Sequence, residues 1–130
     1  MVNGFEDLEA WKEARKLRIA VSAICHGFPS EEKFRLKDQL LRSARSITAN
    51  IAEGHGRFHY QENIQFCRQA RGSLSETLDH LICACDEAYI NANQLAGIRK
   101  HYEHILRLIN GYIRYLKKRK AEAASIKPID

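Results

Sequence analysis

The feature that most constrains the fold is a stripe of apolar residues between positions 95 and 116, spaced alternately three and four residues apart. An α-helix turns once every 3.6 residues, so this spacing places the whole stripe on one helix face. Such a face is stable in water only when other elements cover it. The stripe comprises Leu95, Ile98, Tyr102, Ile105, Ile109, Tyr112 and Leu116.

Three earlier segments show the same helical period. We expect the first helix to end at Gly27 in the left-handed conformation, and the second to begin after Ser30 as its N-cap and to stop at Gly54 and Gly56. We expect the third, from about residue 60, to be the longest. The predicted core positions are Ala10, Ala14, Leu17, Val21, Ile24 and Phe28, then Leu36, Leu40, Ala44, Ile47 and Ile51, then Ile64, Cys67, Ala70, Leu74, Leu78, Leu81, Cys85 and Ala88.

Four amphipathic helices joined by short connections pack as antiparallel neighbours. No useful stretch of the chain alternates with a period of two residues, so we expect no strands. The 130 residues, of which 45% are hydrophobic, can supply one core. The sequence therefore predicts an all-α, antiparallel, up-down-up-down four-helix bundle over residues 1–120, with residues 121–130 as a flexible tail.

The N-terminal residues are mainly acidic, unlike a signal peptide, and no apolar run approaches the length of a membrane span. We therefore expect a cytoplasmic protein with no membrane partner. The four cysteines, Cys25, Cys67, Cys83 and Cys85, lie inside the helical patterns, so we expect them to be reduced and structural.

Some apolar side chains lie outside the main stripes of the first and last helices. A monomeric bundle buries one stripe per helix, so a second stripe favours contact with another copy of the chain; the alternative is a wider core face. These residues are Trp11 and Ile19 in the first helix and Leu106, Ile113 and Tyr115 in the last.

The chain carries no P-loop, no GxSxG, no HExxH and no CxxC motif. His101 and His104 could share one helix face, but no partner cluster stands at diagnostic spacing, so we interpret them as surface histidines. We predict no catalytic residue, no metal site and no cofactor.

Two features of the second and third helices call for a structural explanation. Ser46, Asn50 and Glu53 share a face of the second helix and either line a binding groove or, as we favour, hydrogen-bond to Ser73 or Glu76 on the third. Gly72 lies in mid-helix, where it costs about 1 kcal/mol relative to alanine. We expect a close approach of another helix there, with an approaching ligand as the alternative.

The positive charge is concentrated rather than even. The net charge is +5, and residues 99–120 hold eight basic residues against Glu103 alone, a net of +7. Clustered cations indicate an anionic partner, whereas a lysine run at a chain end is often only solvated. Our candidates for phosphate contact, on several helices and one loop, are Arg42, Arg45, Arg57, Arg68, Arg71, Arg114 and Lys117.

Two stretches carry a resemblance to a known family: SITANIAEG at residues 46–54, followed by Arg57, and ARGSLSE at residues 70–76. FEDL at residues 5–8 with Trp11, and Phe28-Pro29 followed by Gln39-Leu40, fit the same pattern. From about residue 5 to 116 the chain resembles the bacterial four-helix-bundle family named after the 23S rRNA intervening sequence. The chain differs from that pattern near His59, where a Ser or Thr cap is expected, near Asn63, where an aromatic is expected, and at Arg71, where an apolar residue is common.

The resemblance implies a ring-like homopentamer, encoded in some members within insertions of ribosomal RNA genes. It also implies kinship with the basic accessory proteins of diversity-generating retroelements, which associate with a reverse transcriptase and nucleic acid. The positions that match the family motif are expected to support the fold: Asn50, Glu53, Gly54, Gly72, Ser73 and Glu76.

We therefore expect a non-enzymatic, oligomeric helical scaffold that binds nucleic acid, structured RNA in particular, through phosphate contacts without base specificity. The alternative is a protein-interaction adaptor that docks a partner enzyme, such as a reverse transcriptase, through apolar anchors such as Trp11. Phosphate binding weakens steeply with salt, and apolar docking does not.

Overall fold

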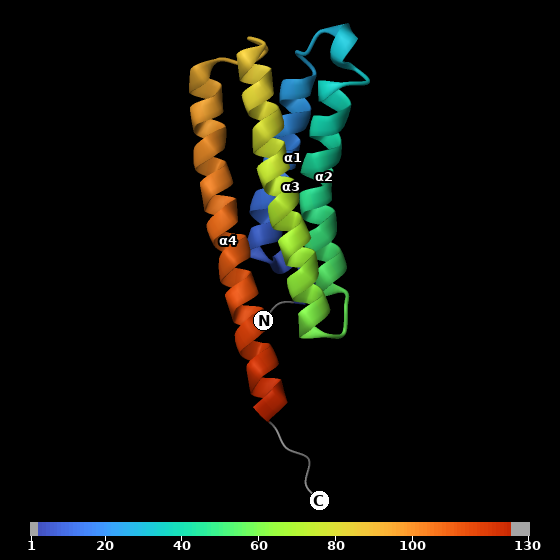
Figure 1. Ribbon diagram of the computed structural model, residues 1–130, viewed down its shortest axis with the longest axis vertical. Helices are drawn as coiled ribbons and strands as arrows, with labels where there is room; N and C mark the ends of the chain where they lie inside the picture. Colours follow the sequence, from blue (N-terminus) through green and yellow to red (C-terminus); the bar gives the residue numbers. More distant parts are fainter. Residues whose placement is uncertain (1–2, 126–130) are drawn as a thin grey trace, which may run out of the picture.

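The computed structural model describes residues 3–125, and within that range the chain forms four α-helices and no strands (Figure 1). This confirms the predicted all-α class. None of these helices carries an apolar stretch sufficient to cross a lipid bilayer. The elements are the short 3₁₀ helices η1 (Phe5–Asp7) and η2 (Ser30–Glu32), and the α-helices α1 (Glu9–Cys25), α2 (Leu36–His55), α3 (Tyr60–Asp86) and α4 (Ala92–Ser125).

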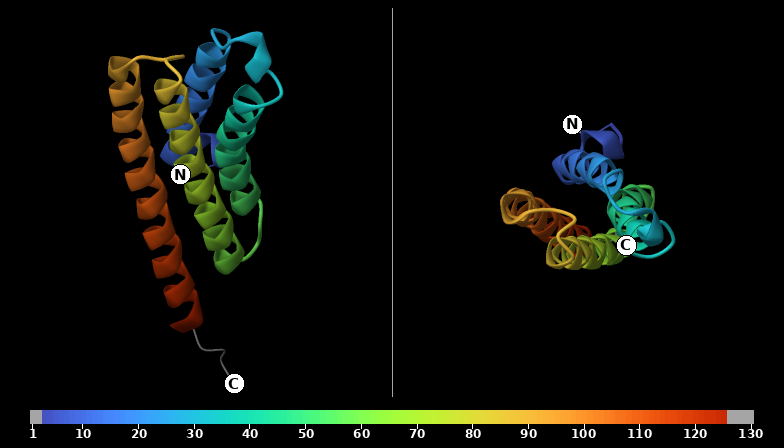
Figure 2. Two further views of the ribbon diagram at one scale, coloured as in Figure 1. Left: turned by 45° about the horizontal axis from the view of Figure 1, so that its top comes forward. Right: turned by 90° about the horizontal axis from the view of Figure 1, so that it is seen from above.

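The helices stand at the corners of a square, each antiparallel to the next along the chain (Figure 2). α2 packs on α1 and α3, and α4 packs on α3 and α1, whereas the backbones of α2 and α4 lie diagonally opposite within the described residues and do not approach closely. The α1–α4 edge has the least contact of the four. The arrangement is therefore the expected up-down-up-down bundle, with α1 and α4 meeting along its weakest edge.

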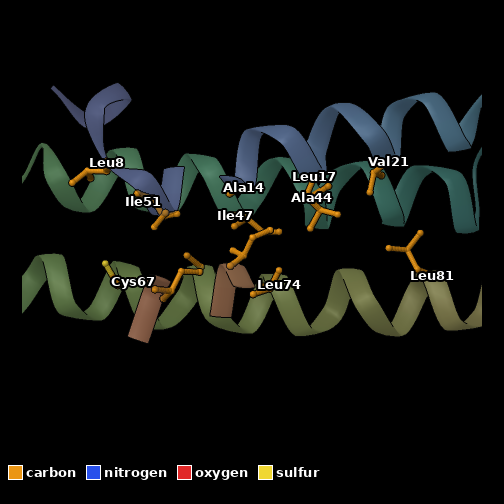
Figure 3. Packing of buried hydrophobic residues seen from close by; sticks show 14 of the residues in the cluster. Leu8, Ala14, Leu17, Val21, Ala44, Ile47, Ile51, Cys67, Leu74 and Leu81 are labelled. Carbon is orange, nitrogen blue, oxygen red and sulfur yellow. The ribbon is translucent and has the colours of Figure 1, made fainter. Parts of the chain in front are cut away.

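The apolar stripes meet inside this square. Leu17 of α1, Ile47 of α2, Leu74 of α3 and Ile105 of α4 are all at most 2% exposed. In Figure 3 the labelled side chains of α1 and α2 point toward those of α3. The core is wider than one stripe on α4, since Ile113, expected at a subunit contact, is 4% exposed and belongs to it.

Two predicted helix boundaries are wrong. Gly27 does not adopt a positive φ, because α1 ends at Cys25 and successive turns follow, with the amide of Gly27 donating to the carbonyl of Ile24 at 3.1 Å. Ser30 makes no side-chain cap but begins η2. The backbone at Arg35 (φ −121°, ψ −110°) interrupts the helical path, so α2 begins only at Leu36.

Gly54 does not stop α2 either. The helix continues to His55, and Gly54 is buried against α3. A Cβ added at Gly54 would lie 2.7 Å from Asn63 Oδ1 and 2.8 Å from Phe66 Cβ, so only glycine allows this close approach of the two helices.

α4 exceeds the expected length. It spans 34 residues against 27 in α3, which corrects the prediction that α3 is the longest helix. It also continues through Ser125 and so includes the first part of the expected tail, while residues 126–130 lie outside the described residues. As Figure 1 shows, the C-terminal end of α4 extends past the start of α3.

The connection between α3 and α4 is closed by local hydrogen bonds. Ala88 adopts a positive φ of 63°, and the amide of Tyr89 donates to the carbonyl of Ala84 at 2.8 Å. Asn91 Oδ1 accepts from the amide of Gln94 at 2.8 Å, and Gln94 Oε1 accepts from the amide of Asn91 at 2.8 Å. This reciprocal pair is a capping box that defines the start of α4.

Candidate nucleic-acid interface

A groove with basic edges runs between the start of α3 and the end of α4. It encloses about 400 Å³, and Lys120 Nζ on α4 donates to Gln61 Oε1 on α3 at 2.6 Å. We call it the basic groove, and its lining residues include three cations and no acid: Gln61, Ile64, Arg68, Lys117, Lys120, Ala121 and Ala124. Arg68, Lys117 and Lys120 are exposed, so their charges are accessible to a ligand.

Two more predicted residues lie near this groove. Arg71, one turn along α3 from Arg68, is half-buried, and its guanidinium donates to Asn110 Oδ1 on α4 at 2.8 Å. This bond explains how a cation is accommodated where the family often has an apolar residue. Arg114 is exposed about one turn before Lys117 on α4.

Arg42 and Arg45 do not join this group. Both are exposed on α2, which lies diagonally opposite α4 in the described part of the bundle. The guanidinium of Arg42 also lies 3.1 Å from the carboxylate of Asp38, one turn earlier on the same helix. The structure therefore divides the predicted basic residues between two sides of the bundle.

Arg57 lies in the connection between α2 and α3, surrounded by acids. Its guanidinium contacts Glu53 at 2.8 Å and Glu62 at 3.5 Å, and it stands 5.1 Å from the centre of the Phe66 ring. Two carboxylates face one guanidinium, so this cluster has no excess positive charge for a phosphate.

Two of the family-motif residues join α2 to α3: Gly54, which lies against Asn63 and Phe66, and Ser73, which donates to Ser46 at 2.9 Å. The favoured interpretation of the polar face on α2 is confirmed for Ser46 only, because Asn50 donates to Ser46 on its own helix at 2.9 Å and Glu53 pairs with Arg57. Gly72 is exposed and a Cβ there would meet nothing within 4 Å, so the predicted close approach at Gly72 is wrong. That role belongs to Gly54. The last motif residue, Glu76, lies 3.5 Å from the imidazole of His80 on its own helix.

His101 and His104 both face Glu13 across the α1–α4 edge, with Nε2 atoms 3.4 and 3.7 Å from the carboxylate. A hydrogen bond from Lys16 lowers the pKa of Glu13, and the charges of Lys16 and the two histidines lower it further. Within residues 3–125, no group of three His, Cys, Asp or Glu side chains is arranged to hold a metal ion.

Sequence reasoning missed a second feature, an aromatic cleft of about 700 Å³ at the loop end of the bundle. The only local signal was the interleaving of aromatic and basic residues in HGRFHY at residues 55–60. We define the aromatic cleft by its lining residues, which come from the end of α2, the α2–α3 connection, α3, α4 and the residue before α1: Leu8, His55, Arg57, Phe58, His59, Tyr60, Asn63, Tyr112, Tyr115 and Leu116.

The comparisons with known proteins decide the family. The model of the family described as 23S rRNA-intervening sequence protein matches residues 6–111, most of the chain. The chain belongs to this family. This confirms the resemblance seen in the sequence, and no curated protein matches the chain.

A solved relative agrees with the fold of this family member. It is a protein of unknown function from the S23 ribosomal protein family of Bacteroides thetaiotaomicron, 22% identical, with a TM-score of 0.73. The match covers 80% of this chain and 97% of the other. At this identity the likeness shows the shared four-helix architecture, and neither comparison indicates an enzyme family.

Proposed function

We propose that this protein is a non-enzymatic, oligomeric helical scaffold that binds structured RNA through phosphate contacts at the basic groove. The observation that carries the proposal is the convergence of Arg68, Lys117 and Lys120 on one groove that has no acidic lining residue. Exposed cations that lack a facing carboxylate can neutralise phosphates and release their counterions.

The nature of the contacts supports binding without base specificity. Lysine presents a point charge on a flexible stem. The groove is also lined by the apolar residues Ile64, Ala121 and Ala124, which make no hydrogen bonds that could distinguish base edges. Arg114 extends the positive surface along α4. The family name refers to an intervening sequence of 23S rRNA, which favours RNA over DNA as the polymer.

Oligomerisation would multiply this modest charge. The net charge per chain is only +5. In a ring of identical copies the basic grooves repeat, and one RNA can contact several of them, so that overall affinity exceeds that of a single groove.

The test is fluorescence anisotropy of labelled duplex RNA with the wild-type protein and with an Arg68→Glu/Lys117→Glu variant, titrated from low to physiological salt. We expect wild-type affinity to fall steeply with salt. The variant should bind more weakly, and the slope of log K against log salt should decrease by about 2, one for each lost phosphate contact.

The matched control is Lys33→Glu/Arg35→Glu, which makes the same change in net charge at two exposed positions in the connection before α2. It should weaken binding less than the groove variant. Equal effects of the two variants would indicate non-specific attraction to net charge, and an absence of wild-type binding at low salt would refute the proposal. Arg42→Glu/Arg45→Glu, in the same assay, measures the contribution of α2.

One observation favours the adaptor as a second candidate. On the outer face of α1, Ile19 is 56% exposed and Trp11 is half-buried, and both border a shallow pocket with Arg15. A partner protein anchored there would remain bound at high salt, because apolar burial is not screened. Salt-resistant co-purification of a reverse transcriptase that is lost on Ile19→Glu would support this function.

A further inference from the structure

The aromatic cleft and the basic groove lie along neighbouring turns of the same two helices, α3 and α4. Tyr60 and Asn63 of α3 line the cleft, while Gln61 and Ile64, their neighbours in the chain, line the groove. On α4 the boundary falls between Leu116 in the cleft and Lys117 in the groove. The two sites are therefore separated by no more than one helix diameter, roughly 10 Å, which one bound RNA can span.

The cleft offers aromatic faces to solvent. Phe58 is 100% exposed and Tyr115 is 54% exposed. The rings of Tyr112 and Tyr115 are nearly parallel, with centroids 6.1 Å apart and an interplanar angle of 11°. Tyr115 thus extends an existing stack toward solvent, and a further planar ring can continue it.

Hydrogen-bonding groups stand among these rings. Asn63 Nδ2 donates to the Tyr112 hydroxyl at 3.1 Å, which fixes both side chains deep in the cleft. Burial raises the pKa of Tyr112, so its hydroxyl stays protonated and can donate. His55 and His59 add imidazoles to the lining.

The cations at the cleft are already paired with acids. None of the residues that line the cleft is acidic, but Arg57 contacts Glu53 and Glu62, and Arg119 at its edge lies 3.2 Å from Glu122. The cleft therefore suits an uncharged flat ring, while the phosphates of the same ligand meet the cations of the basic groove.

We propose that the aromatic cleft receives an unpaired nucleobase of the RNA whose backbone lies in the basic groove. This inference rests on the proposed function and adds a specific substrate feature to it: an unstacked nucleotide, as in a bulge, loop or single-stranded end. A cleft of about 700 Å³ is within the usual range for a small-ligand site and can enclose a base with its ribose. The base stacks on Tyr115 and Phe58.

The test uses two RNAs, a fully paired duplex and the same duplex with one additional, bulged 2-aminopurine nucleotide in one strand. Stacking of the bulged base on tyrosine quenches its fluorescence, which reports occupation of the cleft directly. We expect quenching and tighter binding of the bulged RNA by the wild-type protein. Tyr115→Ala and Phe58→Ala should abolish the quenching and weaken binding of the bulged RNA by between about fivefold and about 140-fold.

Phe34→Ala is the matched control. Phe34 is 84% exposed and lies just before α2, at the opposite end of the bundle from the aromatic cleft, so its removal should change neither signal. Tyr115→Leu and Phe58→Leu retain apolar bulk without a ring, and circular dichroism of each variant establishes that it is folded.

The two proposals fail in different ways. If the duplex binds with a steep salt slope but the bulged base is not quenched, the cleft proposal is overturned and the phosphate-binding proposal stands. If neither RNA binds, both are refuted. If Tyr115→Ala changes only the sedimentation mass of the protein, the cleft is a contact between copies of the chain, and the nucleobase proposal is wrong.

Discussion

At the scale of single residues, two glycines in the family motif have opposite environments. Gly54 lies in α2 against Asn63 and Phe66 of α3, where no larger residue fits without movement. Gly72 lies in α3 with open space around it. The sequence predicted Gly54 as a helix end and Gly72 as the site of close approach, whereas the structure places both inside helices and the close approach at Gly54.

Substitution by alanine should therefore affect the two sites in opposite directions. Gly54→Ala should lower the free energy of unfolding by about 1–3 kcal/mol, because its Cβ would overlap Phe66 Cβ, which cannot move without its backbone. Gly72→Ala should raise it by up to about 1 kcal/mol through helix propensity. Urea unfolding followed by circular dichroism measures both, and equal destabilisation would contradict the assigned helix contact.

Glu13 should make stability depend on pH at the α1–α4 edge. Its pKa is lowered in the folded protein, first by the hydrogen bond from Lys16 and then by the charges of Lys16, His101 and His104. A lowered folded pKa contributes stability that is present above the unfolded pKa and is lost as pH falls through the folded value.

Glu13→Gln should accordingly be less stable than wild type at neutral pH, and the difference should shrink as the pH falls below the ordinary glutamate value of 4.5. Urea unfolding at a series of pH values gives this difference. Glu103→Gln, an exposed site on α4, is the control and should show a smaller dependence. A Glu13→Gln difference that does not change with pH would contradict the assignment.

At the scale of elements, α4 depends on its first turn more than the other helices do. η1, α1, η2, α2 and α3 start without a side-chain cap, whereas α4 starts with the reciprocal bonds between Asn91 and Gln94. The preceding Ala88 has a positive φ, so the turn before α4 is strained as well. The capping box therefore offsets an unfavourable turn.

Removing this cap should cost measurable stability. Asn91→Ala should lower the free energy of unfolding by about 1 kcal/mol, because it leaves the amide of Gln94 without its acceptor. Asn93→Ala, at an exposed position two residues later, should change the free energy of unfolding by less than about 0.5 kcal/mol. Thermal unfolding of the pair compares them, and similar shifts would argue against a capping role.

At the scale of the whole molecule, the bundle is unevenly closed. Of the four pairs of neighbouring helices, α1 and α4 have the least contact. The outer face of α1 carries the exposed Ile19 beside the half-buried Trp11. Exposed apolar area of this kind is stabilised when another copy of the chain covers it. The resemblance of the sequence to its family predicts a ring of five copies.

Sedimentation equilibrium should therefore find a mass near five times 15.0 kDa. Ile19→Glu should shift the distribution toward monomer, because a buried carboxylate at a subunit contact is unfavourable. Phe34→Glu, which adds the same charge at an exposed site in the connection before α2, should not do so. A wild-type monomer at all concentrations would contradict the oligomeric scaffold.

Much of the fold was predictable because helical periodicity is local. The spacing of Leu95 through Leu116 is sufficient to place one face of α4 in the core, and the same holds for Leu17, Ile47 and Leu74 on the other helices. Family membership was also predictable, since the motifs at residues 46–54 and 70–76 are contiguous in the sequence. Helix ends were less predictable. Gly27 and Ser30 are residue types that often end or begin helices, but Gly27 does not adopt a positive φ and Ser30 makes no side-chain cap.

The candidate site depended on tertiary structure. Arg68 and Lys117 are distant in the sequence but line one groove, because α3 and α4 are antiparallel. Phe58 and Tyr115 meet at one cleft for the same reason. The sequence by itself determined four amphipathic helices and their positive charge, because these follow from residue type and spacing. Only the packing of those helices decided which charges converge, which are offset by acids and which glycine is irreplaceable, because these depend on neighbours far apart in the chain.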